Sequence, residues 1–157
     1  MAQTAIRLRV SVRISGLVDG DNGARLVPIL SYSESFVNGS DDRGVTRAYQ
    51  ELAGTVTNGT NEIALQTGTD FEGTALGLTK ARLVALQNTG SNEILFTQAN
   101  SDSIFQSGVA IQVDPGGFLL GINPGAAGWA VDSDDIALRM TSSATDRIDY
   151  DLLVVGS

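Results

Sequence analysis

The sequence of 157 residues contains no cysteine and no histidine. The absence of cysteine excludes disulfide bonds and a thiol nucleophile, and the two absences together remove the usual ligands of zinc, iron and copper. Without histidine the chain has neither a Ser-His-Asp triad nor the most common general acid or base. The remaining residue types name no reaction, so we expect no enzyme, no catalytic residue, no bound metal and no cofactor.

Charged residues are also scarce, and basic ones most of all. The chain has 10 basic and 18 acidic residues, a net charge of −8, and 18% charged residues, against about 25% in an average soluble domain. No basic cluster can neutralise several phosphates, which argues against nucleic acid as a partner. No run of 18 apolar residues and no charged-then-apolar leader is visible, so we expect no membrane segment and no signal peptide. Few charges among many small polar residues are typical of a surface that makes protein contacts.

What the chain does contain is a β-strand pattern. Apolar residues alternate strictly with polar ones between Ile6 and Ile14, which predicts a half-buried strand. Short apolar runs follow, separated by turn signals rich in Asn, Asp, Gly and Pro, of which Asp114-Pro115-Gly116-Gly117 is the strongest. The later strands are expected at residues 26–32, 45–56, 62–66, 81–87, 93–97, 110–113, 118–122, 129–131, 136–140 and 150–155.

This succession of short apolar runs and turn signals predicts a single all-β domain over residues 1–157, an antiparallel, jelly-roll-like β-sandwich of about eight to ten short strands. The segment 45–56 is ambiguous, because Val45, Tyr49 and Leu52 also fit one face of a short helix. Glycines at its ends and β-branched neighbours favour a strand. In a jelly roll the first and last strands are antiparallel neighbours, a register that would place Val10 against Leu152 and Leu8 against Val154.

Three arginines, Arg7, Arg9 and Arg13, lie on one face of the first predicted strand. Residues 1–13 carry a charge of +3, whereas the rest of the chain has 7 basic and 18 acidic residues. Because the planar guanidinium group suits carboxylates, this stripe is a candidate contact with an acidic surface of a partner chain. The alternative is a solvated face with pairs inside the chain, such as Arg13 near Asp149 in the jelly-roll register.

The last strand points to assembly. Tyr150, Leu152 and Val154 face one side, and the opposite side begins with acidic residues but ends with Leu153 and Val155. The outer face of an isolated sandwich is expected to stay polar, so these two residues need cover. A loop of the same chain or a neighbouring subunit can supply it, and the neighbour is the preferred hypothesis.

Other polar features are weaker candidates. The acidic turns 19–22 and 132–135 offer oxygen ligands for calcium, but the twelfth position counted from Asp19 is Leu30 and not glutamate, so solvated turns are favoured. No carboxylate pair stands in a frame recognisable for glycoside hydrolysis. Trp129 follows a glycine-rich stretch and could stack on a sugar, although its apolar neighbours favour a place in the core or an interface.

The segment 78–92 (LTKARLVALQNTGSN) resembles the middle of small structural proteins of tailed bacteriophage virions. The turn at 113–118 (VDPGGF) and the spacing to Trp129-Ala130-Val131 and Ile136-Ala137-Leu138 extend the resemblance to about residues 60–157. The resemblance implies a jelly-roll capsid decoration or cement protein, made in the host cytoplasm and then bound to the capsid, and acting as a homo-oligomer, often a trimer, on the major capsid protein or other virion proteins. It transfers no individual site residue.

The leading prediction is therefore a non-enzymatic virion protein that stabilises the assembled shell, with Arg7, Arg9 and Arg13 as polar contacts and Leu153 and Val155 as apolar ones. The alternative is a carbohydrate- or receptor-binding module of a tail fibre or lectin-like protein, which predicts an exposed Trp129 beside the acidic turns. A small hydrolase that uses Asp or Glu is the third and least favoured reading.

Overall fold

The computed structural model describes residues 7–18, 25–39, 44–57, 59–69, 73–98, 110–125, 128–131, 137–141 and 147–157. Within these ranges all regular structure is β, in twelve strands and without a helix. The strands are β1 (Arg7–Val18), β2 (Arg25–Asn38), β3 (Gly44–Val45), β4 (Arg47–Val56), β5 (Thr60–Ala64), β6 (Lys80–Asn88), β7 (Ile94–Gln98), β8 (Ile111–Val113), β9 (Phe118–Ile122), β10 (Trp129–Ala130), β11 (Ala137–Thr141) and β12 (Ile148–Gly156).

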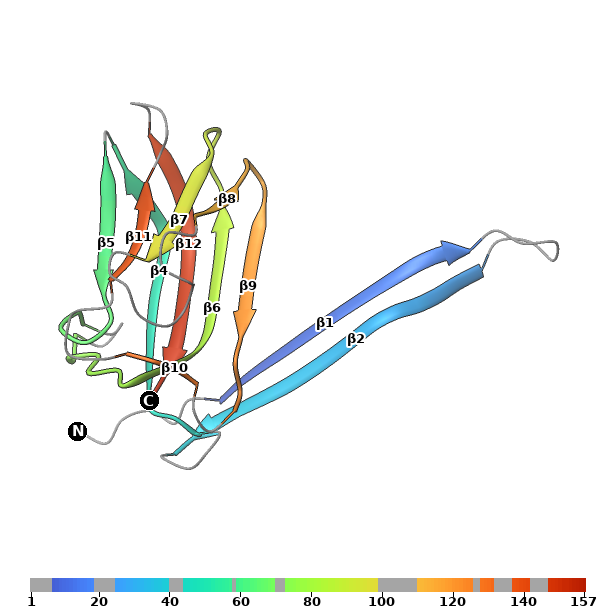
Figure 1. The fold of residues 1–157 in the computed structure, drawn as a ribbon, viewed down its shortest axis with the longest axis horizontal. Coiled ribbons are helices and arrows are strands. Elements are labelled where there is room, and N and C mark those ends of the chain that lie inside the picture. Colours follow the sequence, from blue (N-terminus) through green and yellow to red (C-terminus); the bar gives the residue numbers. More distant parts are fainter. Residues whose placement is uncertain are drawn as a thin grey trace.

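Two antiparallel sheets form the body, packed face to face (Figure 1). One sheet has the order β10-β6-β12-β4, with β9 also paired to β6, and the other has the order β5-β11-β7-β8. The prediction of an all-β antiparallel sandwich is confirmed. The expected strands at 45–56, 81–87, 118–122 and 150–155 are present within a few residues, because their alternation and flanking turn signals both specified extended backbone.

The turn between β8 and β9 shows how closely local chemistry can specify structure. Gly117 donates its N–H to the carbonyl oxygen of Asp114 at 2.7 Å, with Pro115 and Gly116 between them and Gly116 at φ 75°. Proline supplies the fixed φ of the first central position and glycine the positive φ of the second, as in a type II turn. This turn was predicted from the sequence.

The first strand lies outside the body. β1 pairs along its length with β2, from Arg7 opposite Val37 to Val18 opposite Arg25, and this hairpin, the arm, projects away from the sandwich (Figure 1). The predicted register between the first and last strands is therefore wrong. β4 and β6 flank β12 on its two sides. Alternation identified β1 as a strand but could not identify its partner. Pairing with β2, the next strand in the sequence, requires closing a short loop, which costs less entropy than pairing with a distant strand.

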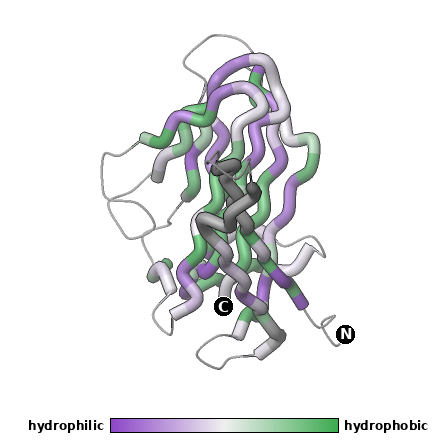
Figure 2. Tube along the Cα trace, turned by 90° about the vertical axis from the view of Figure 1, so that its right-hand side faces the viewer, coloured by the Kyte–Doolittle hydropathy of each residue, from purple (hydrophilic) through white to green (hydrophobic). Residues whose placement is uncertain are grey.

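Two apolar clusters hold the molecule together. The first lies between the two sheets and includes Phe96, Tyr150 and Leu152. The second lies on the other side of the β4-β12-β6-β9 sheet, hereafter its outer face, where Phe36 at the base of the arm packs with Leu83 and Val155. Figure 2 shows hydrophobic and hydrophilic residues alternating along the strands of the body, in keeping with a sheet that is covered on one face throughout and on the other in part.

Candidate interaction surface

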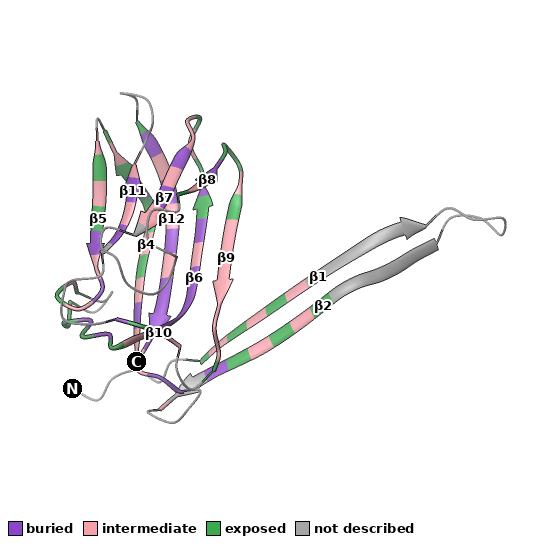
Figure 3. Ribbon diagram, in the orientation of Figure 1, coloured by how far each residue is buried: buried purple, intermediate pink, exposed green. Residues whose placement is uncertain are grey.

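The arm has two chemically different sides. Along β1 the residues from Arg7 to Val12 alternate between exposed and half-buried, and β2 does the same from Ser31 to Ser35 (Figure 3). Arg7 and Arg9 are on the exposed side, where the Nε–H of Arg9 donates to the Oγ of Ser33 at 3.4 Å. The backbone of Arg13 pairs with Ser31, but its side chain lies outside the described residues. The predicted arginine face is thus present at Arg7 and Arg9.

The opposite side of the arm is mainly apolar among the described side chains, with the charged Glu34 across from Val10. Leu8 stands across from Phe36, and Val12 stands across from Tyr32. Leu8, Val10 and Phe36 pack into the second cluster at the base of the arm. Val12 and Tyr32 lie further along and are half-buried, outside that cluster. Among the side chains that the structure describes on this side, those of Leu8, Val10 and Phe36 are the ones that pack on the body.

The outer face of the sheet receives the base of the arm. Strand pairing aligns Val155 with Leu83 and Ala48, and Leu83 with Ile122, in one row across the sheet. Val155 is only 1% exposed, because the base of the arm packs over this row. The cover of Val155 thus comes from its own chain and not from the neighbouring subunit that was the preferred hypothesis. Leu153, one row further, is half-buried.

Beyond these rows the outer face is open. Leu52 is 65% exposed and Phe118 is 62% exposed, and both line a shallow pocket with Ala85 and Leu153. We call these four residues the outer patch. Gln50, Gln87 and Asp151 add polar groups to the lining. The pocket measures about 110 Å³, well below the roughly 300 Å³ at which ligand pockets begin, so it fits a protein side chain better than a metabolite.

A β-bulge at Leu52 and Ala53 borders this patch. The pairing of β4 with β12 shifts between Tyr150 and Leu152, so that Leu52 and Ala53 together oppose Asp151. Ala53 has φ 53°, an unfavourable left-handed conformation for a residue with a Cβ atom. Its N–H donates to Oδ1 of Asp151 at 2.7 Å, which satisfies a backbone group that the bulge removes from the ladder.

Next to the bulge, the inner side holds a cluster of hydrogen-bonded polar side chains. Oε2 of Glu51 accepts from the hydroxyls of Tyr49 at 2.7 Å and Tyr150 at 3.0 Å, and Asn61 donates to the Tyr150 hydroxyl at 2.6 Å. Burial and the hydrogen bond to Glu51 raise the pKa of Tyr49, and burial raises the pKa of Tyr150 above the ordinary value. Both phenols stay protonated at neutral pH, so neither can act as a base or nucleophile, and the cluster serves to hold β4, β5 and β12 together.

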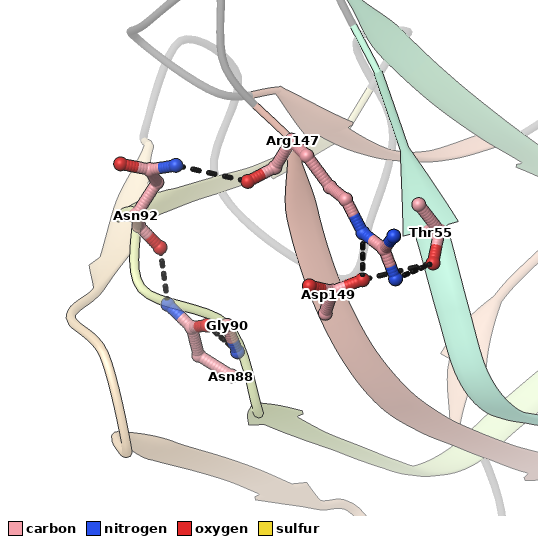
Figure 4. Close-up of polar contacts among 6 residues, drawn as sticks. All are labelled: Thr55, Asn88, Gly90, Asn92, Arg147 and Asp149. Carbon is pink, nitrogen blue, oxygen red and sulfur yellow. Dashed lines mark hydrogen bonds and ion pairs between the residues drawn. The ribbon is translucent and has the colours of Figure 1, made fainter.

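The predicted partner of Asp149 was also wrong. Figure 4 shows Asp149 beside Arg147 and Thr55, and its Oδ1 accepts from Nε of Arg147 at 2.6 Å and from the hydroxyl of Thr55 at 2.9 Å. These two hydrogen bonds lower the pKa of Asp149. Arg13 belongs to the arm, which pairs in a different sheet. Arg147, which directly precedes β12, therefore takes the role assigned to Arg13.

Asn88 anchors the turn beside this group (Figure 4). Its side chain is fully buried. It donates to the carbonyl oxygens of Asn92 and Val113, both at 2.8 Å, and accepts from the N–H of Gly90 at 3.0 Å. The sequence marked this stretch as a turn, and the structure adds that Asn88 joins the end of β6 to the end of β8.

The remaining candidates gain little support. The acidic turns 19–22 and 132–135 lie outside the described residues, and the described part holds no group of three Asp or Glu side chains placed to bind a metal ion. Trp129 is half-buried against the inner core, the environment that the sequence favoured. In the described ranges, no helix reaches the length and apolar character needed to cross a membrane.

Sequence reasoning missed Leu52 and Phe118, although Phe118 directly follows the predicted turn and starts a strand whose alternate residues face outward. No protein-family model, no curated protein and no solved structure matches this chain significantly. The case for a function therefore depends on the arm, the outer face and the outer patch.

Proposed function

We propose that this protein is a non-enzymatic structural subunit of a bacteriophage virion, a capsid decoration or cement protein. In this role it assembles with copies of itself as a trimer and binds the major capsid protein. The observation that carries the proposal is the projecting arm with one apolar side and one arginine-bearing side. An isolated two-stranded hairpin is marginally stable in water, so a hairpin that projects from its own body is best explained by contact with another polypeptide.

The strand order supports the finer description of the sandwich as a jelly roll. The sheet β4-β12-β6-β9 faces the sheet β5-β11-β7-β8, and the chain passes between the sheets as jelly rolls do. Jelly rolls are frequent in viral capsid proteins and also in lectins, so the fold alone does not choose a function. The small volume of the outer pocket and the position of Trp129 against the core favour the structural role over the carbohydrate-binding one.

The mechanism of such a protein is mass action. A protein that binds the assembled shell, and not the free shell subunits, shifts the equilibrium toward assembly. Weak contacts repeated by symmetry reinforce one another, because the second contact of an oligomer forms at high effective concentration. No residue needs to perform chemistry, in agreement with the absence of histidine and cysteine.

Light scattering and particle binding test the proposal together. We expect a mass that is a small multiple of 16.4 kDa, three times this value for a trimer, and saturable co-sedimentation with capsids in a fixed copy number. Added Ca²⁺ should leave the melting curve unchanged. A monomer at all concentrations that ignores capsids would overturn the proposal, and a Ca²⁺-stabilised monomer that binds glycans would replace it with the carbohydrate-binding function.

A further inference from the structure

We propose that the outer patch is the docking site for the apolar side of the arm of a second copy of this chain. This inference rests on the proposed function, since it names the surface through which the subunits assemble. The donor is the part of the arm around Val12 and Tyr32, and the acceptor is formed by Leu52, Ala85, Phe118 and Leu153.

The first argument is that the chain already shows how this type of contact forms. At the base of the arm, Leu8 and Phe36 pack on the outer face over the row of Leu83 and Val155. The next pair on the same side of the arm is Val10 and Glu34, and the pair after it, Val12 and Tyr32, is again largely apolar. The patch continues the same outer face from that row toward Phe118. Both surfaces therefore extend an existing contact, but in different directions.

The second argument is geometric. The arm joins the body near Ile122, the last residue of β9, whereas Phe118 is at the opposite end of that strand. From its base the arm diverges from β9 (Figure 1). It therefore leaves the outer patch of its own chain exposed, and its own far half is directed at space that a neighbour can occupy.

The third argument is area. Twelve residues of strand extend about 40 Å, and a two-stranded ribbon is about 10 Å wide, so one side of the whole arm offers roughly 400 Å². The base of the arm already packs on its own body, which leaves about half of this side, roughly 200 Å², for a neighbour. In a reciprocal pair each subunit contributes one arm end and one outer patch to the same interface, about 400 Å², which is half of the roughly 800 Å² that each partner buries in a typical stable interface. The contact therefore has the size of a weak interface, which repetition by symmetry reinforces.

The fourth argument is charge. Residues 39–157 contain 6 basic and 15 acidic residues, a net charge of −9, whereas the arm with its loop, residues 7–38, has four basic and three acidic residues, a net charge of +1. Asp151 lies in the lining of the pocket, and Glu34 lies on the docking side of the arm. The long-range attraction between an arm and the body of a second copy is therefore favourable but small.

The chain has no cysteine, so engineered thiols report contacts without background. Two singly substituted chains, one tagged, are co-expressed and treated with a short bis-maleimide crosslinker. One chain carries Val12→Cys or Tyr32→Cys in the arm, and the other carries Leu52→Cys or Phe118→Cys in the patch. The matched control replaces the patch variant with Ala110→Cys, an exposed residue beside β8 in the other sheet. We expect crosslinked heterodimers from at least one arm–patch pair, about tenfold above the control.

A second measurement does not require crosslinking. Phe118→Ser removes an exposed side chain and should leave the fold intact while it raises the dissociation constant of the oligomer by about tenfold or more, as expected for a central aromatic contact. Ala110→Ser is the control and should change nothing.

The outcomes separate the two proposals. An oligomer that shows no arm–patch crosslink, and that Phe118→Ser does not weaken, overturns this inference and leaves the structural function standing. Crosslinks only between two arm positions overturn it in favour of arm–arm pairing. If a chain that carries one arm substitution and one patch substitution crosslinks only within itself, the contact is intramolecular and the inference is overturned as well. A protein that is monomeric under all conditions overturns the proposed function itself.

Discussion

Two buried phenylalanines separate the stability of the arm from that of the body. Phe36 is 1% exposed and Phe96 is 0% exposed, but Phe36 lies in the outer cluster and Phe96 in the core between the sheets. Truncation of a buried phenylalanine to alanine typically costs about 3–5 kcal/mol. Since the chemical change is the same in both variants, differences between them report the position of each residue in the fold.

We expect Phe96→Ala to lower the free energy of global unfolding by about 3–5 kcal/mol. Phe36→Ala should act mainly on a local opening that releases the arm, since the inner core is untouched. A loss of about 3 kcal/mol in that opening corresponds to about 150-fold faster amide exchange in β1 and β2. Exchange in β6 and β12 at residues that face the inner core should change much less.

Hydrogen exchange measured by mass spectrometry, together with urea unfolding, distinguishes the two effects. Light scattering on the same samples should show weaker assembly for Phe36→Ala, because a released arm no longer holds its orientation. Equal destabilisation of arm and body in both variants would refute the reasoning, since the arm would then be part of the cooperative unit of the sandwich.

Three further variants or conditions test the body. Asn88→Ala should lower the free energy of unfolding by about 3 kcal/mol, because three hydrogen bonds of about 1 kcal/mol each are lost in a buried site; an unchanged melting temperature would contradict this role. Gly54→Ala should lower the free energy of unfolding by about 1–3 kcal/mol, because the added Cβ atom would stand 2.6 Å from the ring of Tyr150. Gly125→Ala is the control and should be neutral in the same urea titration, because its Cβ atom would lie 3.6 Å from the nearest atom. The free energy of unfolding should also fall as the pH rises above about 10, the ordinary pKa of tyrosine. The reason is that Tyr49 and Tyr150 have raised pKa values and stay protonated in the folded state, whereas the unfolded state releases both protons. If the free energy of unfolding is flat between about pH 9 and pH 11 and tyrosinate absorbance is ordinary, these phenols are not held by burial and Glu51.

The sequence predicted the type and position of most strands of the body because each carries its own periodic pattern between turn signals. It also predicted that the side of β12 with Leu153 and Val155 needs cover, and the structure places Val155 under the arm. What it could not predict was pairing. The alternation of Leu8 and Val10 says that one side of β1 is apolar, and this is equally true of a strand inside a sandwich and of a strand in a projecting hairpin.

The outer patch was missed for a different physical reason. Leu52 follows the alternation of Ala48 and Gln50 onto the outer face, but alternation cannot register how much of that face the rest of the chain leaves exposed. It also cannot register the bulge at Ala53, which reverses the facing of the residues that follow it. Phe118 was identified as part of a strand, but its exposure depends on how far along the outer face the arm reaches.

The pairing of β12 explains why the arm pairs with no strand of the sandwich through this strand. A strand can pair on only two sides, and β4 and β6 occupy both sides of β12. The inner core is closed by the second sheet, and the first row of the outer face is filled by Phe36 and Leu8. Within the described residues, the contacts of the arm with its own body include those of Leu8, Val10 and Phe36 at its base. The chain also carries an exposed apolar patch at Leu52 and Phe118, and the proposed docking would bury this patch under the arm of a second molecule.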